Sequence, residues 1–289
     1  AGRPGTCLSG PSARAVSLLA PPPVSSPYFE PNLWYGGARA LLRAAALGPQ
    51  CLHAKVQHGW QVGTGLDGEQ GMKWHLRRFG LPYLLWTRAN AEACRAEDMT
   101  DGTAIGAPFL YALEGLQTIA WTTPGDLGLL LAFPLHSVVD YRVDPARWPA
   151  YVQAVRRQAT KHGYDRVAVC LHEEDWRDGD AAREVQTAGA MAVTAGPVRH
   201  PLFLERLARL IGQASVVASE RVCTTTFYAS LLGRPFMLLR DAPMQTTPVD
   251  PDEGMAGDSA WLAEHYPQYA SPTVDREVAW RELGGDCLL

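Results

Sequence analysis

The chain has 289 residues, which is long enough for one large domain or two smaller ones. Hydrophobic residues make up 47% and charged residues 19%, so the composition excludes a disordered chain and predicts a sizeable core. The formal net charge is -4, and the scattered Lys and Arg residues argue against nucleic-acid binding, because phosphate-backbone affinity comes from clustered cations. A small anionic ligand is compatible with this charge, since a few fixed donors suffice to bind it.

The six cysteines and the hydropathy pattern restrict the class of protein further. The cysteines are widely spaced and form no C-x-x-C pair, so a zinc cluster is not expected. Cys170 lies in an apolar run and is expected to be a core residue. No apolar run approaches the roughly 20 residues that span a bilayer, and the N-terminus has no basic region followed by an apolar core. We therefore expect a cytoplasmic protein with no bound metal and no membrane span.

The first half of the chain predicts a flexible arm followed by a small α/β domain. Residues 1–27 are rich in Gly, Pro, Ser and Ala, which is typical of a loosely ordered arm. The turn Pro124-Gly125 marks a boundary, so residues 28–125 are expected to form one domain. The elements expected within it are a helix over 38–47, strands over 51–57 and 82–87, a helix from about residue 90, and a weaker strand over 103–107.

The second half, residues 126–289, predicts a doubly wound α/β domain. Its strands are apolar throughout and are separated by helices, which implies a parallel sheet covered on both faces. The expected strands cover 127–134, 166–171, 191–194, 215–219 and 235–239. The expected helices cover 149–161, 201–212, where Pro201 would be the first helical residue, and 226–232. The first half is expected to repeat this plan in a smaller form.

Ligands of doubly wound sheets gather at the carboxyl ends of the strands, so polar residues that follow strands are the candidate site residues. The segment Ser219–Thr226 follows one strand and opens a helix. Helix-start hydroxyls and free backbone N–H groups at the positive end of the helix dipole are typical of phosphate sites. The alternative is plain N-capping, which needs only one of the hydroxyls. The candidate donor-binding residues here are Glu220, Arg221, Thr224, Thr225 and Thr226.

A second candidate segment is Leu171–Trp176, directly after the strand RVAVC. His172 is suited to donate to a phosphate or to exchange a proton near neutrality. One of the three following acids, of which Glu174 is our candidate, would act as a general base for an acceptor hydroxyl. The alternative is that the acids form a solvated first helical turn, which the helix dipole also favours.

Two further strand ends carry histidines. His58-Gly59 follows a strand of the first half, and we expect His58 to be the catalytic base or else a structural histidine. His136 follows the run LLLAFPL, with Asp140 nearby to orient the ring. Two other motifs are weaker. Gly63–Gly68 fits the dinucleotide motif G-x-G-x-x-G, but residues 58–62 separate it from the strand before it, and no acidic residue is well placed about 20 residues further on. Residues 250–253 (DPDE) are expected to be a solvated turn rather than a metal site.

The segment ASVVAS-ERVCTTT-FYASLLG-RPFMLL resembles the donor-binding segment of glycosyltransferases with two facing Rossmann-like domains, the GT-B fold. It is most similar to bacterial enzymes with CMP- or CDP-linked donors, which are sialyl- and Kdo-transferases and teichoic-acid glycerophosphotransferases. His172 and Thr224–Thr226 match the strand-end histidine and the hydroxyl cluster of that family, and His58-Gly59 matches an early His-Gly of the glycerophosphotransferases. The segments FPLHS and VAVCLHEEDW look like those of bacterial surface-polysaccharide biosynthesis proteins.

The resemblance implies two Rossmann-like domains that face each other across a cleft, with 28–125 as the acceptor side and 126–289 as the donor side. It implies a metal-independent glycosyltransferase of polysaccharide or natural-product biosynthesis, with a CMP- or UDP-linked sugar donor, a hydroxyl acceptor and no cofactor. His58, His136 or Glu174 would handle the acceptor proton. The alternatives are a nucleotide-sugar epimerase or hydrolase, and a non-catalytic nucleotide-sugar-binding protein.

Overall fold

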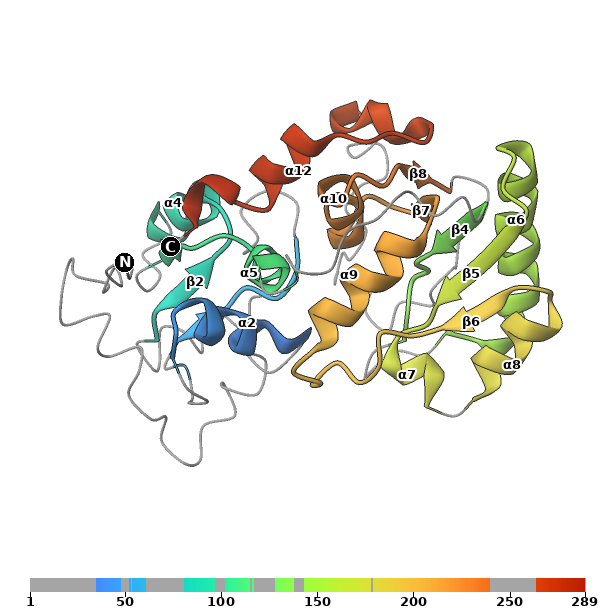
Figure 1. The fold of residues 1–289 in the computed structure, drawn as a ribbon, viewed down its shortest axis with the longest axis horizontal. Coiled ribbons are helices and arrows are strands. Elements are labelled where there is room, and N and C mark those ends of the chain that lie inside the picture. The colour runs from blue at the N-terminus through green and yellow to red at the C-terminus, as the bar shows by residue number, and fades with distance from the viewer. Residues whose placement is uncertain are drawn as a thin grey trace.

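The computed structural model describes residues 35–47, 52, 54–60, 81–96, 102–114, 116, 128–137, 143–177, 179–239 and 264–288. These residues form two parallel sheets that lie side by side, each covered by helices (Figure 1). The predicted fold class, two α/β units each built on a parallel sheet, is therefore confirmed. The predicted arm over 1–27 and the predicted boundary turn at 124–125 lie outside the described residues.

The first sheet has three short parallel strands in the order β1-β2-β3. They are β1 (Lys55–Val56), β2 (Tyr83–Leu85) and β3 (Gly102–Ala104). Within the described residues, the helices that accompany them are α2 (Gly37–Ala44), α4 (Arg88–Ala96) and α5 (Pro108–Glu114). Successive side chains of β2 point to opposite faces. Tyr83 and Leu85 accordingly pack with Ala91 and Cys94 of α4, whereas Leu84 belongs to the core shared with α2 and α5.

The second sheet has five parallel strands in the order β6-β5-β4-β7-β8. The strands are β4 (Leu129–Ala132), β5 (Arg166–Cys170), β6 (Met191–Val193), β7 (Val216–Ser219) and β8 (Phe236–Leu238). The helices are α6 (Trp148–Lys161), α7 (Glu173–Trp176), α8 (Asp180–Thr187), α9 (Phe203–Gln213) and α10 (Thr224–Leu231). Cys170 is a buried, free cysteine, as expected for a core residue.

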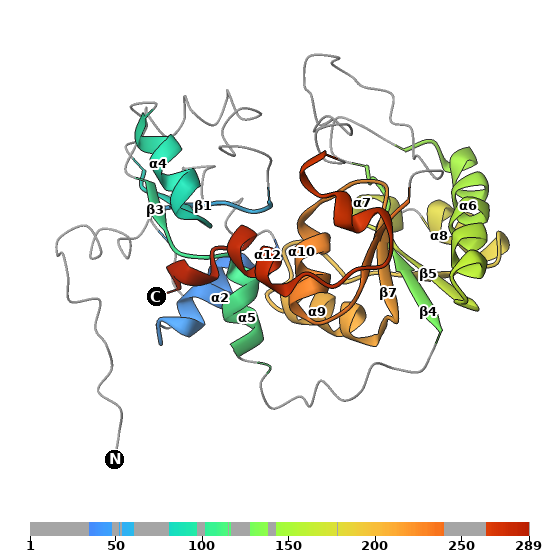
Figure 2. The same cartoon turned by 90° about the horizontal axis from the view of Figure 1, so that it is seen from above.

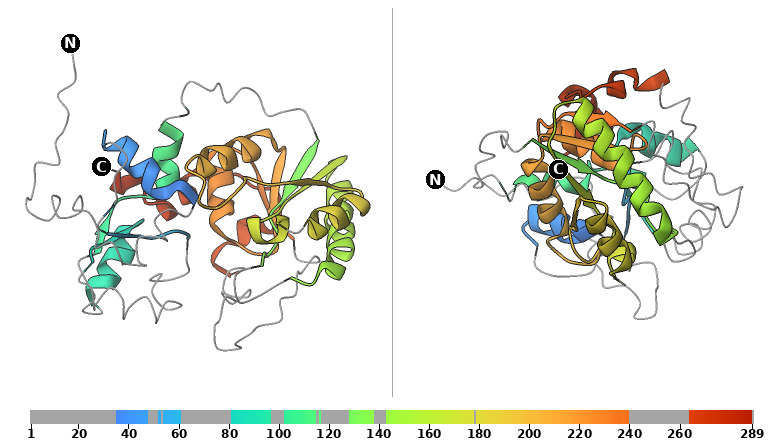
Figure 3. Two further views of the ribbon diagram at one scale, coloured as in Figure 1. Left: turned by 90° about the horizontal axis from the view of Figure 1, so that it is seen from below. Right: turned by 90° about the vertical axis from the view of Figure 1, so that its right-hand side faces the viewer.

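Helices cover both faces of the second sheet. Leu130 and Ala132 of β4 point toward α6 and α8, and the view from the outer side shows α6 crossing this face (Figure 3). Leu129 and Leu131 point to the opposite face, where α9 and α10 pack. That second core continues without a break into α2 and α5 of the first half, so one apolar cluster joins the two halves.

This topology predicts a ligand crevice, and the strand order places that crevice between β4 and β7. The chain runs outward from β4 to β5 and β6, and then returns to add β7 on the other side of β4. In doubly wound sheets, ligands bind outside the carboxyl ends of the strands at the point where the order reverses. The residues that follow β4 and β7 are therefore those that this topology selects.

The C-terminal segment crosses from the second half back to the first (Figure 2). Its elements are η3 (Pro267–Ala270), α12 (Arg276–Glu282) and η4 (Gly285–Cys287). Thr273 pairs with Phe236 of β8, and α12 then leads to Leu283, whose carbonyl accepts a hydrogen bond from the amide of Ala107 at 2.8 Å. Gly284 has a φ of 68°, and a Cβ there would lie 1.8 Å from the carbonyl oxygen of Trp86. Only glycine fits this crossing point.

Two helix starts differ from the prediction. Helix α9 begins at Phe203 instead of Pro201, because His200 Nδ1 accepts the amide of Leu202 and holds the preceding residues in a turn. Helix α10 begins at Thr224 instead of Thr226, because Cys223 serves as its N-cap.

Candidate functional site

Two histidines face each other at the carboxyl ends of neighbouring strands. His136 follows β4 and His172 follows β5, and their rings stack with centroids 4.0 Å apart and an interplanar angle of 14°. Both side chains are partly exposed. The structure thus brings together two residues that the sequence predicted separately.

The hydrogen bonds of the two rings assign them opposite tautomers. His136 Nδ1 lies 2.9 Å from the carbonyl oxygen of Ser137, an acceptor, so Nδ1 carries the proton and Nε2 is free to accept. His172 Nδ1 accepts the amide of Glu174 at 3.3 Å, so its proton is on Nε2, which can donate. One ring of the pair therefore offers an acceptor and the other offers a donor.

Both histidines of the pair are neutral near pH 7. Burial lowers the pKa of His172 to about 3, and His136 and Arg177 add to this effect. Burial also lowers the pKa of His136, and the Arg221 guanidinium lowers it further. The Ser137 carbonyl and the Asp175 carboxylate raise this pKa, but burial is the largest effect. A neutral imidazole has one donor nitrogen and one acceptor nitrogen, whereas both nitrogens of a protonated ring donate. Because both rings are neutral, His136 can accept a hydrogen bond while His172 donates one.

A buried carboxylate ties the two histidine loops together. Asp175 is 8% exposed, and its carboxylate accepts both the amide (3.0 Å) and the hydroxyl of Ser137. The same hydroxyl accepts the amide of Val143 at 2.8 Å. The expectation that Asp175 is solvated is therefore wrong, because its carboxylate satisfies buried donors. The predicted orienting acid, Asp140, lies outside the described residues.

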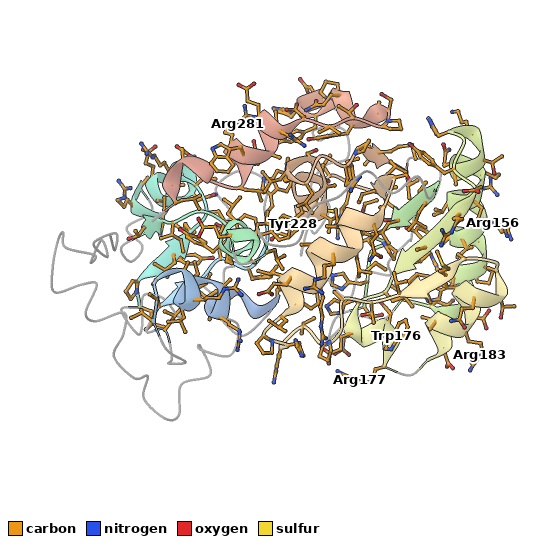
Figure 4. The ribbon with its side chains drawn as sticks, viewed as in Figure 1. Arg156, Trp176, Arg177, Arg183, Tyr228 and Arg281 are labelled. Carbon is orange, nitrogen blue, oxygen red and sulfur yellow. The ribbon has the colours of Figure 1, made fainter. Side chains whose placement is uncertain are left out.

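The two other acids of this segment have structural partners. Glu173 Oε2 accepts the amide of Val198 at 2.8 Å. Glu174 forms an ion pair with Arg177 at 2.8 Å, and Figure 4 shows Arg177 on the outside of the molecule. The three acids do form the first turn of α7, as the alternative interpretation expected. The catalytic role of Glu174 gains no support from these contacts and stays a prediction.

The end of β7 carries Glu220 and Arg221, both partly exposed. Arg221 lies close enough to His136 to lower its pKa, so the residues after β4 and β7 meet at the strand-order reversal. Tyr151 of α6 lies near Glu220, and its hydroxyl is fully buried and has no hydrogen-bond partner in the described part of the chain. Burial raises the pKa of Tyr151, and the nearby Glu220 and Cys223 raise it further.

The three threonines at the start of α10 have three different environments. Thr226 is fully buried, and its hydroxyl accepts the amide of Cys223 at 3.0 Å in a capping box. Full burial gives no support to the predicted contact of Thr226 with a phosphate, which stays a prediction. Thr225 is partly exposed, with its hydroxyl 3.1 Å from Cys223 Sγ. Thr224, also partly exposed, accepts the backbone amide of Trp60 at 2.9 Å.

The contact between Thr224 and Trp60 places the His58-Gly59-Trp60 loop of the first half against the start of α10. A Cβ at Gly59 would lie 3.5 Å from Thr224 Oγ1. The His58 ring stacks at 6.2 Å on Tyr35, which in turn packs at 5.1 Å against Phe203 of α9. Burial and the charge of Lys55 lower the pKa of His58 to about 4, so His58 is also neutral near pH 7.

Several expectations are not decided by these contacts. The G-x-G-x-x-G motif at 63–68 and the acidic turn at 250–253 lie outside the described residues. Within the described ranges, no three His, Cys, Asp or Glu side chains are close enough to share a metal ion. No helix of the described part is long and apolar enough to cross a membrane.

Sequence reasoning gave no role to three residues that the structure adds to the site. Ser137 and Tyr151 lie on the second-half side, and Trp60 connects the two halves. The neighbouring His58-Gly59 and His136 were the only signals for Trp60 and Ser137. Tyr151 has no such signal, because its spacing from Trp148, Val152 and Val155 indicates simply the apolar face of a helix.

Comparison with known proteins finds similarity only to solved structures. No protein-family model matches the chain, and no curated protein matches it. The UDP-GlcNAc 2-epimerase from Neisseria meningitidis bound to UDP-GlcNAc is 11% identical, with a TM-score of 0.42 over 88% of this chain and 77% of the epimerase. A variant of the wall teichoic acid polymerase TagF is 13% identical, with a TM-score of 0.44 over 80% of this chain and 63% of the polymerase.

The heptosyltransferase WaaC from E. coli with ADP-2-deoxy-2-fluoro heptose is 12% identical, with a TM-score of 0.31 over 81% of this chain and 77% of the transferase. At such identities and TM-scores, the likeness carries no argument about the activity of this chain. It assigns no role to any residue of this chain.

Proposed function

We propose that the chain is a glycosyltransferase of the GT-B type, which binds the phosphates of a nucleotide-activated sugar between the end of β7 and the start of α10. The amides of Thr224 and Thr225 have no intrahelical partners, because the first N–H groups of a helix never do. They lie at the positive end of the helix dipole, beside the cation Arg221. This arrangement favours a phosphate group.

The leaving phosphate would be stabilised by donors that are already in place. Neutral His172 presents Nε2–H, Arg221 presents a guanidinium and the start of α10 presents backbone amides. Donors that are fixed before the reaction stabilise developing negative charge without a reorganisation cost, and many enzymes owe most of their rate enhancement to such donors. The Glu220 carboxylate would accept hydrogen bonds from hydroxyl groups of the sugar donor.

The acceptor hydroxyl needs a base, and two neutral histidines are candidates. His136 has Nε2 free to accept, and Asp175 fixes its loop through Ser137. His58 lies on the first-half side of the junction, where an acceptor would arrive. A neutral imidazole can take the proton of a hydroxyl as it attacks, and general-base catalysis of this kind contributes about a hundredfold or more.

The single observation that carries the proposal is the pair His136 and His172, neutral and of opposite tautomers, at the strand ends beside Arg221. A purely structural histidine would not need to lie where His136 does, after β4 at the reversal of the strand order. That is the place where the topology directs ligands.

Calorimetric titration with UDP, CDP and CMP, and with uridine as the phosphate-free control, tests the proposal. We expect the nucleotides to bind and uridine to bind at least about tenfold more weakly, because charged hydrogen bonds to phosphate are lost. Thr225→Ala is expected to weaken nucleotide binding, whereas Thr160→Ala on the exposed face of α6 is the matched control. Equal affinities of both variants and the wild type for UDP would count against the proposal.

Incubation of the protein with a UDP-linked sugar and no acceptor separates the proposed transferase from an epimerase or hydrolase. A transferase leaves the donor largely intact until a hydroxyl acceptor is added. An epimerase or hydrolase converts the nucleotide sugar without any acceptor. Rapid conversion in the acceptor-free sample would replace the transferase proposal with that second class of enzyme.

A further inference from the structure

Trp60 connects three parts of the chain that are far apart in sequence. Its backbone amide donates to Thr224 Oγ1 of the second half at 2.9 Å. Its indole Nε1 donates to Glu282 Oε2 of the C-terminal helix α12, also at 2.9 Å. Its ring packs on Phe227 of α10, with centroids 4.8 Å apart, and edge-on against Tyr266 at 5.9 Å.

The carboxylate of Glu282 fixes the indole from the far side. It also accepts a hydrogen bond from the hydroxyl of Tyr266, and its charge helps to raise the pKa of Tyr266. Hydrogen bonds to a charged acceptor are roughly twice as strong as those between neutral groups. The orientation of Trp60 is therefore set by α12, which itself connects the two halves.

Thr224 has one hydrogen-bonding capacity left. Its oxygen accepts the amide of Trp60, but its proton has no acceptor in the described part of the chain. A hydroxyl that accepts a hydrogen bond becomes a better donor, and the reverse also holds, because hydrogen bonds in a chain polarise one another. An oxyanion at the start of α10 would complete such a chain.

We infer that Trp60 is a positioning residue and that Thr224 relays occupancy of the anion site to the His58 loop. The inference rests on the proposed function for the presence of an anion at α10. When an oxyanion accepts the proton of Thr224, the bond from the Trp60 amide strengthens, and the loop that carries His58 is held against the second half. A bound nucleotide-sugar donor thereby fixes the position of His58, the candidate base for the acceptor hydroxyl.

The test follows the His58 ring directly by NMR of protein with 13C-labelled histidine. The eight histidine signals are few enough to identify His58 by its loss in His58→Gln. We expect the His58 signal to move when pyrophosphate or UDP is added to the wild type. In Thr224→Val the movement should fall by at least about half at saturating ligand, and Thr224→Ser, which keeps the hydroxyl, should restore it.

Trp60→Phe keeps the backbone amide and the aromatic contact but removes the bond to Glu282. We expect it to bind UDP within about twofold of the wild type, to lose most of the His58 movement, and to lower kcat about tenfold with little change in KM. Trp280→Phe, an exposed tryptophan on the same helix α12, is the matched control and should behave as the wild type does. A merely structural role would lower affinity, turnover and melting temperature together.

The outcomes separate the relay from the proposed function. If Thr224→Val and Thr224→Ser give the same His58 response, or if Trp60→Phe gives the wild-type response and turnover, the relay is wrong. If pyrophosphate binds and moves the His58 signal but no nucleotide binds, the relay stands and the proposal of a nucleotide-activated donor is wrong. If neither ligand binds, both proposals fail.

Discussion

Replacing Asp175 by alanine is the perturbation whose cost the structure defines best. The carboxylate is 8% exposed and accepts both donors of Ser137, its amide and its hydroxyl. Asp175→Ala leaves two donors unsatisfied in a buried place, and each such group costs about 1–3 kcal/mol. We therefore expect a loss of about 3 kcal/mol in the free energy of unfolding, out of a total of about 5–15 kcal/mol for a typical protein.

The measurement is urea unfolding followed by circular dichroism, with Asp180→Ala as the matched control. Like Asp175, Asp180 lies in the first turn of a helix, but its partner is Arg183, and the side chains of Asp180 and Arg183 are 54% and 66% exposed. Exposed ion pairs contribute about 0–1 kcal/mol, so this control should lose well under 1 kcal/mol. Equal losses of unfolding free energy in the two variants would refute the inference that the buried Asp175 carboxylate holds the two histidine loops together.

Three further predictions concern other parts of the molecule. Tyr151→Phe should leave stability unchanged or raise it by about 1 kcal/mol, because it removes an unpartnered buried hydroxyl, whereas Tyr111→Phe, which loses a bond to a backbone carbonyl, should be destabilising. Gly284→Ala should be strongly destabilising by thermal melting, because its φ is positive and an added Cβ would clash with the carbonyl oxygen of Trp86. The folded pKa values of His58 and His172, about 4 and about 3, lie below the ordinary value of 6.5. Between these pKa values and pH 6.5 the unfolded chain therefore binds more protons than the folded protein does. The free energy of unfolding has its full value above about pH 6.5 and falls toward pH 4 by up to about 1.4 kcal/mol per pH unit for each histidine. Asparagine at either position should flatten the profile.

The second sheet was predictable from the sequence because its strands are continuous apolar runs between helices. Residues 166–171 and 215–219 show this pattern clearly, and both contain observed strands. The first sheet was harder, since β1 is only two residues long and its Lys55 is buried in spite of its charge. Helix α5 was missed because its residues 108–112 are all buried, so no helical period is visible in their pattern.

The candidate site was predictable as a set of strand ends, but not as a set of contacts. His136 and His172 were each found from their position after a strand, whereas their stacking depends on the strand order, which the sequence does not specify. The run of three threonines predicted a helix start, but it did not tell which hydroxyl caps the helix. Only the structure shows that Thr226 does so and that Thr224 contacts the first half.

The central claim is that phosphates bind at the start of α10, between the two halves. Amide hydrogen–deuterium exchange with and without saturating UDP locates this site most directly. We expect UDP to slow exchange at residues 221–226, at the histidine loops around 136 and 172, and at the loop over 57–60. Protection confined to other segments, or no protection while UDP is bound, would contradict the account.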